Sequence, residues 1–270
     1  KNHAAAACSA RFSRLDKALA RQIEKPVNRF HAGPSNPQRA TAPCPGVRLI
    51  MICKRCKSAT AIISLPSHNT GFCENCFRDF FSAQVARGIE TGKLFTHEDR
   101  ILVALSGGKD SLTLLYAMKL LQEFYPKRFE LSAITCNVGF EGMDFTGVAE
   151  FCKHLEIPYE QVDTEIARIV FQENKDTRPC SLCAKLRKGA MYQRLGELGI
   201  NKMAYAHNKD DFIETALMSL IYEGRFYAFP PVTELPEAGV TVIRPMMYVF
   251  PSSVYSRPTA AGVSPSRISA

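Results

Sequence analysis

Three groups of residues in this chain have types and spacings that could do chemistry. The first is the turn Ser-Gly-Gly-Lys-Asp-Ser between an apolar run and a helix-like pattern. Helix-start N–H groups and closely approaching glycines favour an anion such as phosphate. Asp110 stands where a Walker loop has Ser or Thr, which disfavours that loop type. The candidate nucleotide-binding residues are Ser106, Gly107, Gly108, Lys109, Asp110 and Ser111.

The second group is the pair Cys180 and Cys183, which follows a proline at the expected start of a helix. The helix dipole favours a thiolate there, and a CxxC pair is typical of metal or redox chemistry. Two buried structural cysteines are the alternative. The third group is a four-cysteine pattern whose CxxC pairs enclose sixteen residues, a spacing that predicts a structural Zn²⁺ site: Cys53, Cys56, Cys73 and Cys76.

A further set of polar residues, His207, Asp210 and Asp211, falls at an expected strand end and helix start. A carboxylate pair in this position could hold Mg²⁺ beside a phosphate group. Asp210 is equally suited to capping the helix, so both roles stay open for it.

The formal charge of +8 is concentrated in the first fifty residues, which hold nine Lys or Arg against two acidic residues. The basic charge therefore belongs to an N-terminal tail and says little about what the folded part binds. This tail is either an artefact of the sequence or a targeting segment. No apolar run is long enough to span a membrane, so we expect no membrane partner. The paired cysteines point to a reducing compartment, and we expect a cytoplasmic protein.

From Arg100 onward, short β-rich runs alternate with amphipathic stretches. This alternation predicts an α/β fold with a doubly wound parallel sheet, preceded by a small zinc ribbon. Ligands of such sheets bind beyond the carboxyl ends of the strands, where Ser106, Cys136 and His207 are expected. The predicted organisation is a basic tail (1–50), a zinc ribbon (51–78), a linker helix (79–98), the α/β domain (99–250) and a disordered end (251–270).

The Ser-Gly-Gly-Lys-Asp-Ser turn resembles the SGGxDS fingerprint of PP-loop ATP pyrophosphatases, with Lys109 at the variable position. Together with "RPCSLCAKLRKGAMY", "KDDFIETALMSLIYEGR" and "VIRPMMYV", it resembles the TtcA-like branch, which makes 2-thiocytidine in tRNA. The resemblance covers about Arg100 to Val249. It implies a HUP-like fold and an enzyme that binds ATP and releases pyrophosphate from it. It also places the His207 segment over the nucleotide, although Ala206 replaces the family's glycine.

In that family, two cysteines of the CxxC pair and a third downstream cysteine hold a [4Fe-4S] cluster. The resemblance thus implies that Cys180 and Cys183 are iron-sulfur ligands, but the third ligand is absent from this sequence. We therefore expect a C-terminally truncated catalytic domain, with either a cluster or a cysteine persulfide as the sulfur carrier. The N-terminal zinc ribbon resembles instead the TtuA group, which leaves the modified base open.

These observations predict an ATP-dependent tRNA sulfurtransferase. The C2 oxygen of a tRNA pyrimidine, cytidine by the TtcA resemblance, would be adenylated and then replaced by sulfur, with Cys180, Cys183 and Asp110 as catalytic residues. The expected partners are tRNA, a cysteine desulfurase or sulfur carrier, and a second copy of the chain. The alternatives are 2-thiouridine synthesis, lysidine-like adenylation without sulfur, and an inactive zinc-ribbon RNA-binding protein.

Overall fold

The computed structural model describes residues 52–65, 70–173 and 179–249. The chain divides into two compact units, Lys1–Phe77 with Ser256–Ala270 and Arg78–Tyr255. The expected tails, 1–50 and 251–270, lie outside the described residues.

The smaller unit contains an antiparallel hairpin of two strands, β1 (Ile63–Leu65) and β2 (Thr70–Phe72). The larger unit contains a six-stranded sheet whose strands are β3 (Asp99–Ala104), β4 (Phe129–Asn137), β5 (Tyr159–Asp163), β6 (Lys202–Ala204), β7 (Val232–Leu235) and β8 (Val240–Ile243). The described helices are α2 (Glu74–Gly92), α3 (Lys109–Phe124), α4 (Thr146–His154), α5 (Ile166–Arg168), α6 (Pro179–Glu197) and α7 (Lys209–Glu223), with a π-helical turn, Ile169–Glu173, and a 3-10 turn, Pro236–Ala238.

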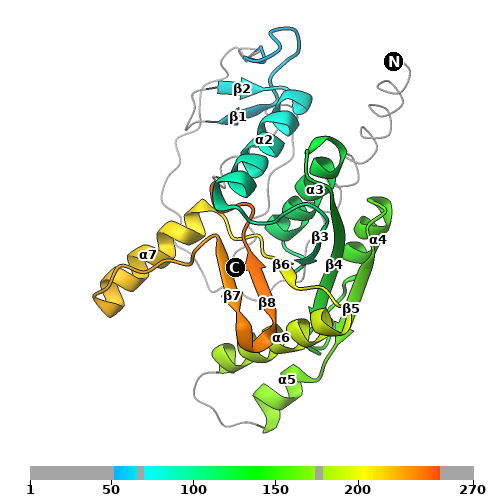
Figure 1. Ribbon diagram of the computed structural model, residues 1–270, viewed down its shortest axis with the longest axis vertical. Helices are drawn as coiled ribbons and strands as arrows, with labels where there is room; N and C mark the ends of the chain where they lie inside the picture. Colours follow the sequence, from blue (N-terminus) through cyan, green and yellow to red (C-terminus); the bar gives the residue numbers. More distant parts are fainter. Residues whose placement is uncertain (1–51, 66–69, 174–178, 250–270) are drawn as a thin grey trace, which may run out of the picture. The chain divides into compact units, whose positions relative to one another are not determined.

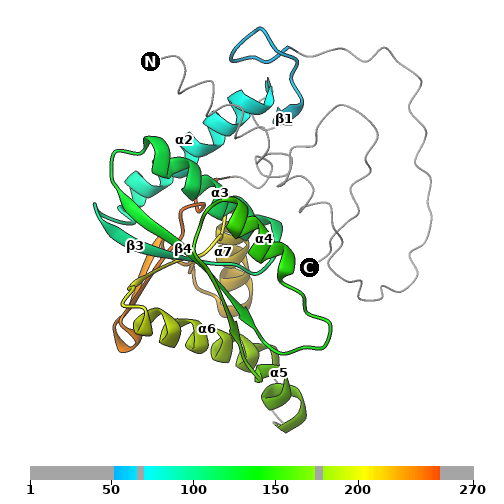
Figure 2. The ribbon, with the colours of Figure 1, turned by 90° about the vertical axis from the view of Figure 1, so that its right-hand side faces the viewer.

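The sheet has the strand order β5-β4-β3-β6-β8-β7, and every neighbouring pair is parallel except β7 with β8. The chain winds outward from β3 to β5 and then returns through α6 to β6 on the other side of β3. This reversal places α3 and α4 on one face of the sheet and α6 on the other (Figures 1 and 2). The predicted doubly wound parallel sheet is confirmed, whereas the antiparallel edge strand β7 was not predicted.

The centre of the sheet is apolar because its strands are covered on both faces. Four consecutive residues of β3, from Ile101 to Ala104, are buried. On the α6 face, Met191 and Leu195 pack in a core cluster with residues of β3, β4, β6 and β8. This packing holds the carboxyl ends of β3, β4 and β6 in fixed positions, and the loops that follow them therefore lie together.

Helix α2 differs from the expected linker helix at 79–98, because it starts at Glu74 and ends at Gly92. Its apolar residues Phe81, Val85 and Ile89 are buried, and they recur at the four-residue spacing that places them on one face of a helix. At Gly88 a Cβ atom would lie 2.8 Å from the carbonyl oxygen of Pro245. A glycine is therefore needed where this helix approaches the chain after β8.

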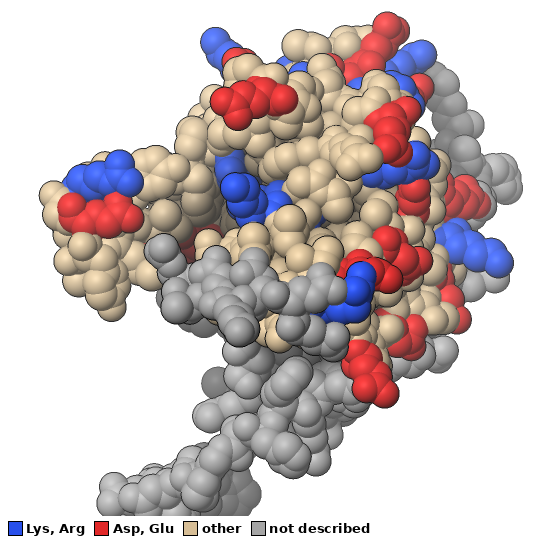
Figure 3. Space-filling model, turned by 90° about the horizontal axis from the view of Figure 1, so that it is seen from below, with Lys and Arg blue, Asp and Glu red and all other residues tan. Residues whose placement is uncertain are grey.

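Helix α7 projects from the rest of the larger unit (Figure 1) and exposes large apolar side chains, among them Ile221 and Tyr222. Charged side chains are sparse over it in the view from below (Figure 3). Among the described helices, none combines the length and the apolar character that a membrane crossing requires.

Candidate active site

The turn between β3 and α3 is closed by its two serines. The Ser111 hydroxyl donates to the carbonyl oxygen of Gly108 (2.8 Å) and accepts from the backbone N–H of Ser106 (3.2 Å). The two hydroxyl oxygens lie 3.3 Å apart, and the N–H of Gly108 also donates to Ser106 Oγ. Gly107 has a φ of +78°, which favours glycine. The loop conformation thus depends on the residue types of the turn itself.

This turn forms one wall of a cavity of about 260 Å³. Ser106, Asp110 and Ser111 line it from the β3–α3 turn, and Cys136 and Val138 line it from the end of β4. Met143 and Phe145 follow from the loop before α4, Arg187 and Met191 from α6, and Tyr205, His207 and Asp211 from the segment after β6. The cavity therefore lies beyond the carboxyl ends of β3, β4 and β6, where a doubly wound sheet binds its ligands.

The predicted set His207, Asp210 and Asp211 separates into two environments. His207 and Asp211 line the cavity, whereas exposed Asp210 is not among the lining residues. Asn208, which the sequence analysis did not single out, caps α7: its Oδ1 accepts from the N–H of Asp210 (2.9 Å). Asp211 completes this capping box by accepting from the N–H of Asn208 (2.7 Å). The pattern Asn-x-x-Asp before the helix was the signal that could have located this cap.

An aromatic and basic cluster surrounds His207. Its ring centroid lies 5.8 Å from that of Tyr205 and 5.0 Å from that of Phe229, and the Arg244 guanidinium lies 4.9 Å from the centroid of the Phe229 ring. Burial, followed by the positive charge of Arg244, lowers the pKa of His207. His207 Nδ1, Tyr205 Oη and Arg244 Nε are buried, and none of them has a hydrogen-bond partner among the described residues. Of the residues in this cluster, the sequence analysis named only His207. The only sign of Arg244 in the sequence was a charged residue directly after the apolar run of the "VIRP" segment.

The predicted sulfur site lies at the start of α6, where Cys180 is exposed and Cys183 is half-buried. Neither cysteine is among the residues that line the cavity. The thiol nearer the predicted nucleotide loop is Cys136, which is buried, lines the cavity and interacts electrostatically with Cys183. Cys152 is fully buried in α4, and burial raises its pKa to about 12, as expected for a structural thiol.

Three or four thiolates ligate a [4Fe-4S] cluster. On α6 only Cys180 and Cys183 carry thiols, and Cys136 is recessed in the cavity wall, where burial raises its pKa. Within the part of the chain that the structure describes, these three are not among the potential ligand groups that converge within 4.8 Å. The described residues therefore do not fit a complete cluster site.

The basic residues of α6 differ in whether acidic side chains pair with them. Arg187 is exposed and lines the cavity, and Lys188 beside it is exposed. Arg194, by contrast, is held by Glu160 (2.6 Å) and Glu197 (2.7 Å). Arg187 and Lys188 are therefore cations of α6 that an external anion could reach. In the view from below, Lys and Arg side chains lie in the hollow beside α7 (Figure 3).

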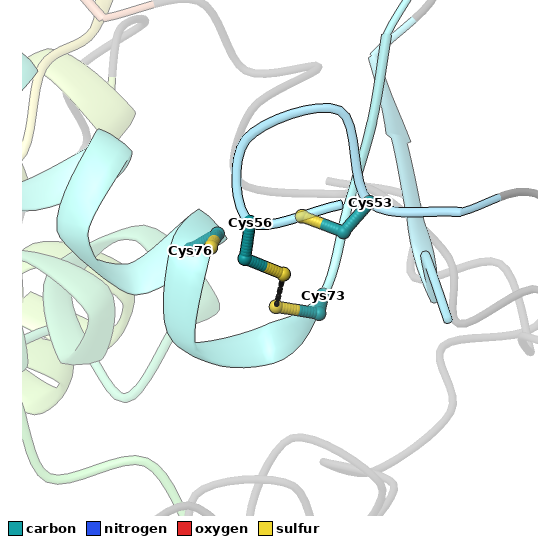
Figure 4. Close-up of side chains that lie close together, drawn as sticks. All are labelled: Cys53, Cys56, Cys73 and Cys76. Atoms are coloured by element: carbon teal, nitrogen blue, oxygen red, sulfur yellow. Dashed lines mark hydrogen bonds between the residues drawn. The ribbon is translucent and has the colours of Figure 1, made fainter. Parts of the chain in front are cut away.

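The four predicted zinc ligands converge in the smaller unit, where their sulfur atoms lie within 4.8 Å of one another (Figure 4). Cys56 Sγ and Cys73 Sγ are 3.9 Å apart, close to the ~3.8 Å that tetrahedral Zn–S bonds of ~2.3 Å require. Hydrogen bonds from Ser58, and then from the backbone of Ala59, lower the pKa of Cys56 to about 5, whereas burial raises that of Cys76 to about 12. The sulfurs form a closed site that could bind zinc.

Comparisons with known proteins match both units. Residues 52–78 match the family model described as the N-terminal LIM domain of the 2-thiouridine synthetase TtuA. Among solved structures, the U34-tRNA thiolase NcsA from Methanococcus maripaludis with its [4Fe-4S] cluster aligns with a TM-score of 0.61. The alignment covers 77% of this chain and 70% of that chain at 23% identity, so it shows a shared fold.

Curated relatives include proteins named tRNA-cytidine(32) 2-sulfurtransferase. The protein from Paraburkholderia phymatum is 36% identical over 169 residues, which cover 62% of this chain and 50% of the relative. The protein from Anaeromyxobacter dehalogenans strain 2CP-C is 36% identical over 166 residues, covering 60% and 57%. The chain thus spans between half and three fifths of the length of these two relatives. Residues 77–260 match the PP-loop domain model, and the chain belongs to the PP-loop family.

Proposed function

We propose that this protein catalyses ATP-dependent 2-thiolation of tRNA. The observation that carries the proposal is the set of residues that line the cavity. It brings the serines of the PP-loop, the thiol of Cys136 and the cation of Arg187 together. A phosphate-binding loop alone fits many reactions, but a loop that shares a cavity with a thiol fits activation of a substrate oxygen followed by attack of sulfur.

The PP-loop would hold the pyrophosphate half of ATP. The start of α3 favours this anion, because the N–H groups and the dipole of a helix point toward it there. The carboxylates of Asp110 and Asp211 line the same cavity from two helix starts. They fit Mg²⁺, which binds through one or two carboxylates together with substrate phosphates and neutralises their charge.

The base oxygen would then attack the α-phosphorus, and pyrophosphate would leave. Adenylation converts the C2 oxygen into a leaving group that departs with AMP, which divides one difficult substitution into two easier steps. Sulfur would enter through exposed Cys180 and half-buried Cys183. We assign these cysteines the task of accepting sulfur from a desulfurase or a sulfur carrier.

The substrate assignment follows from the named relatives and from charge. The relatives act on cytidine by their names, and we propose a tRNA cytidine as the base that is modified. Arg187 and Lys188, which are exposed on the first half of α6, would contact tRNA phosphates. The TtuA-type module favours a second candidate, 2-thiouridine synthesis. We further propose Zn²⁺ as the ion of this module, with a structural role because four thiolates leave no open position.

The test is mass spectrometry of tRNA nucleosides after incubation of the full chain with ATP, Mg²⁺, unmodified tRNA and a persulfide donor. The proposal predicts 2-thiocytidine that requires ATP and is lost in Ser111→Ala. Formation of 2-thiouridine would instead support the second candidate. AMP formation without any thiolated nucleoside would contradict both and favour the lysidine-like alternative.

A further inference from the structure

Two phenylalanines form an exposed pair at the surface of the larger unit. Phe140 follows β4 and is 45% exposed, and Phe171, in the π-helical turn after α5, is 50% exposed. Their ring centroids lie 5.4 Å apart, and the ring planes are inclined by 52°. Neither ring is among the described residues that line the cavity. The pair therefore presents aromatic surface outside the space in which ATP would bind.

The backbone sets the position of Phe140. The N–H of Gly139 donates to Asn137 Oδ1 (3.0 Å), and a Cβ atom at Gly139 would lie 2.6 Å from the carbonyl oxygen of Thr164. This close approach and a φ of +86° both require glycine. They hold the chain after β4 against the segment that precedes α5.

The helical segment that carries Phe171 is anchored on its other face. Ile166 and Val170 belong to the buried core cluster on the α6 face of the sheet. The N–H of Ala167 donates to the carbonyl oxygen of Val138 at the end of β4 (2.7 Å). Both phenylalanines are thus presented on a fixed backbone, which lowers the entropic cost of binding a ligand between or upon them.

The aromatic pair lies beside the cavity. The N–H of Met143 donates to the carbonyl oxygen of Phe140 (3.3 Å), and this bond closes a turn. Met143 itself lines the cavity that the PP-loop serines share. The chain therefore passes from the aromatic pair to the cavity wall within one turn.

The size and the charge of this surface favour a flat, uncharged ligand. Two half-exposed phenylalanines offer roughly 200 Å² of aromatic side chain, whereas a stable protein partner covers about 800 Å² on each side. Glu141 is exposed between Phe140 and Met143. Arg168 of α5 is paired with Glu165. These charges do not favour a phosphate group, whereas a neutral nucleobase fits both the area and the aromatic faces.

We propose that Phe140 and Phe171 stack with an unpaired tRNA nucleotide that neighbours the base being thiolated. This inference rests on the proposed thiolation function. An enzyme that acts on a ring atom of a base takes that base out of the stack of its neighbours. The neighbouring base then loses a stacking partner, and the phenylalanine rings beside the cavity replace it. The surface therefore selects tRNA whose target base lies in a single-stranded loop.

The experiment removes the aromatic face but keeps apolar bulk. Binding of unmodified tRNA to the full-length protein is measured without ATP at about 0.2 M salt, which weakens phosphate contacts. We expect Phe140→Leu to bind roughly ten-fold more weakly, and Phe140→Trp to bind as wild type does because tryptophan also stacks. Phe124→Leu is the matched control, since Phe124 is exposed at the opposite end of α3 from the PP-loop.

Two outcomes of these titrations would overturn the inference. One is equal tRNA affinity of Phe140→Leu and wild type. The other is weaker binding of ATP, rather than of tRNA, by Phe140→Leu, which would assign the rings to the adenine. Wild type that needs Phe140 to bind tRNA but forms no thiolated nucleoside with ATP and a persulfide donor would support the stacking surface and contradict the thiolation function.

A second measurement uses wild-type protein alone. Transfer RNA with 5-iodouridine on either side of the target cytidine is irradiated in the complex, and the crosslinked peptides are mapped by mass spectrometry. Crosslinks to Phe140 or Phe171 are expected, because this base reacts with an aromatic ring on which it stacks. Crosslinks confined to other residues would overturn the assignment of these rings.

Discussion

Ser111 holds the PP-loop closed, because its hydroxyl donates to Gly108 O at 2.8 Å and accepts from Ser106 N at 3.2 Å. The side chain is buried, so its removal takes away the acceptor of the Ser106 N–H, whereas Gly108 O still accepts from the N–H of Leu112 (3.2 Å). We expect Ser111→Ala to weaken ATP binding by roughly ten- to a hundred-fold, equivalent to ~1–3 kcal/mol. Calorimetric titration with ATP measures the change. Thr113→Val is the control: it removes a hydroxyl that donates to Lys109 O within the same helix, and unchanged affinity is expected.

Gly107 and Gly189 form a matched pair of glycines with opposite expected effects. Gly107 has a φ of +78°, and a Cβ atom there would meet nothing closer than 3.8 Å. Gly107→Ala should therefore lower the free energy of unfolding by only the ~1–2 kcal/mol that a left-handed backbone conformation costs an alanine. Gly189 lies within α6 with no atom within 4 Å of its Cβ position, and Gly189→Ala should stabilise by ~0.5–1 kcal/mol. Urea denaturation measures both changes, and a stabilising Gly107→Ala would contradict the assigned loop conformation.

Asn208 begins α7 and shares a reciprocal capping box with Asp211. We expect Asn208→Ala to destabilise the larger unit by ~1 kcal/mol, whereas Asn208→Asp keeps a capping oxygen and should change little. Hydrogen exchange of the first turn of α7 is the measurement. Equal exchange in Asn208→Ala and wild type would mean that the cap is unimportant for this helix.

The half-buried imidazole of His207 predicts a pH dependence of stability. Its pKa in the folded chain lies below the ordinary value of about 6.5, because burial and then Arg244 disfavour the charged form. The unfolded chain therefore binds a proton more readily, so the stabilisation is complete above pH ~6.5 and is lost as the pH falls through the folded value. Denaturation at several pH values should show a steeper acid loss for wild type than for His207→Gln. Parallel curves would contradict this assignment.

The smaller unit should depend on its metal, because so short a module folds around its ion. Chelation of Zn²⁺ is expected to abolish amide protection in β1 and β2, and Cys56→Ser should do the same without a chelator. Lys57→Ala, beside the ligand, serves as a variant that leaves all four thiols in place. If the amides of β1 and β2 stay fully protected from hydrogen exchange in the metal-free protein, the metal does not have a structural role.

Much of the larger unit could be predicted from local patterns. The apolar run of β3 predicted a strand, which the structure confirms, and the turn after it predicted a phosphate-binding loop, because both patterns depend on neighbouring residues. The four candidate zinc ligands were equally clear, and the structure brings their sulfur atoms together as their spacing predicted. The site residues that depend on local sequence were therefore the ones that could be named.

Other features depend on contacts between distant segments. The sequence gives no sign that Arg194 of α6 pairs with Glu160 of β5, because the two residues are far apart in the chain. Cys136 was expected at a strand end, but its burial in a core cluster against which Cys183 of α6 packs arises only when α6 crosses the sheet. Arg244 reaches the cluster around His207 and Phe229 through the β7–β8 hairpin, which was not predicted.

The central claim, adenylation of the base oxygen before sulfur attack, has one direct measurement. The full chain is given ATP, a persulfide donor and tRNA whose cytidine carries a heavy oxygen isotope at C2, and the released AMP is weighed by mass spectrometry. Our account predicts that the label moves into the phosphate of AMP in proportion to the 2-thiocytidine formed. Thiolated product accompanied by unlabelled AMP would contradict it.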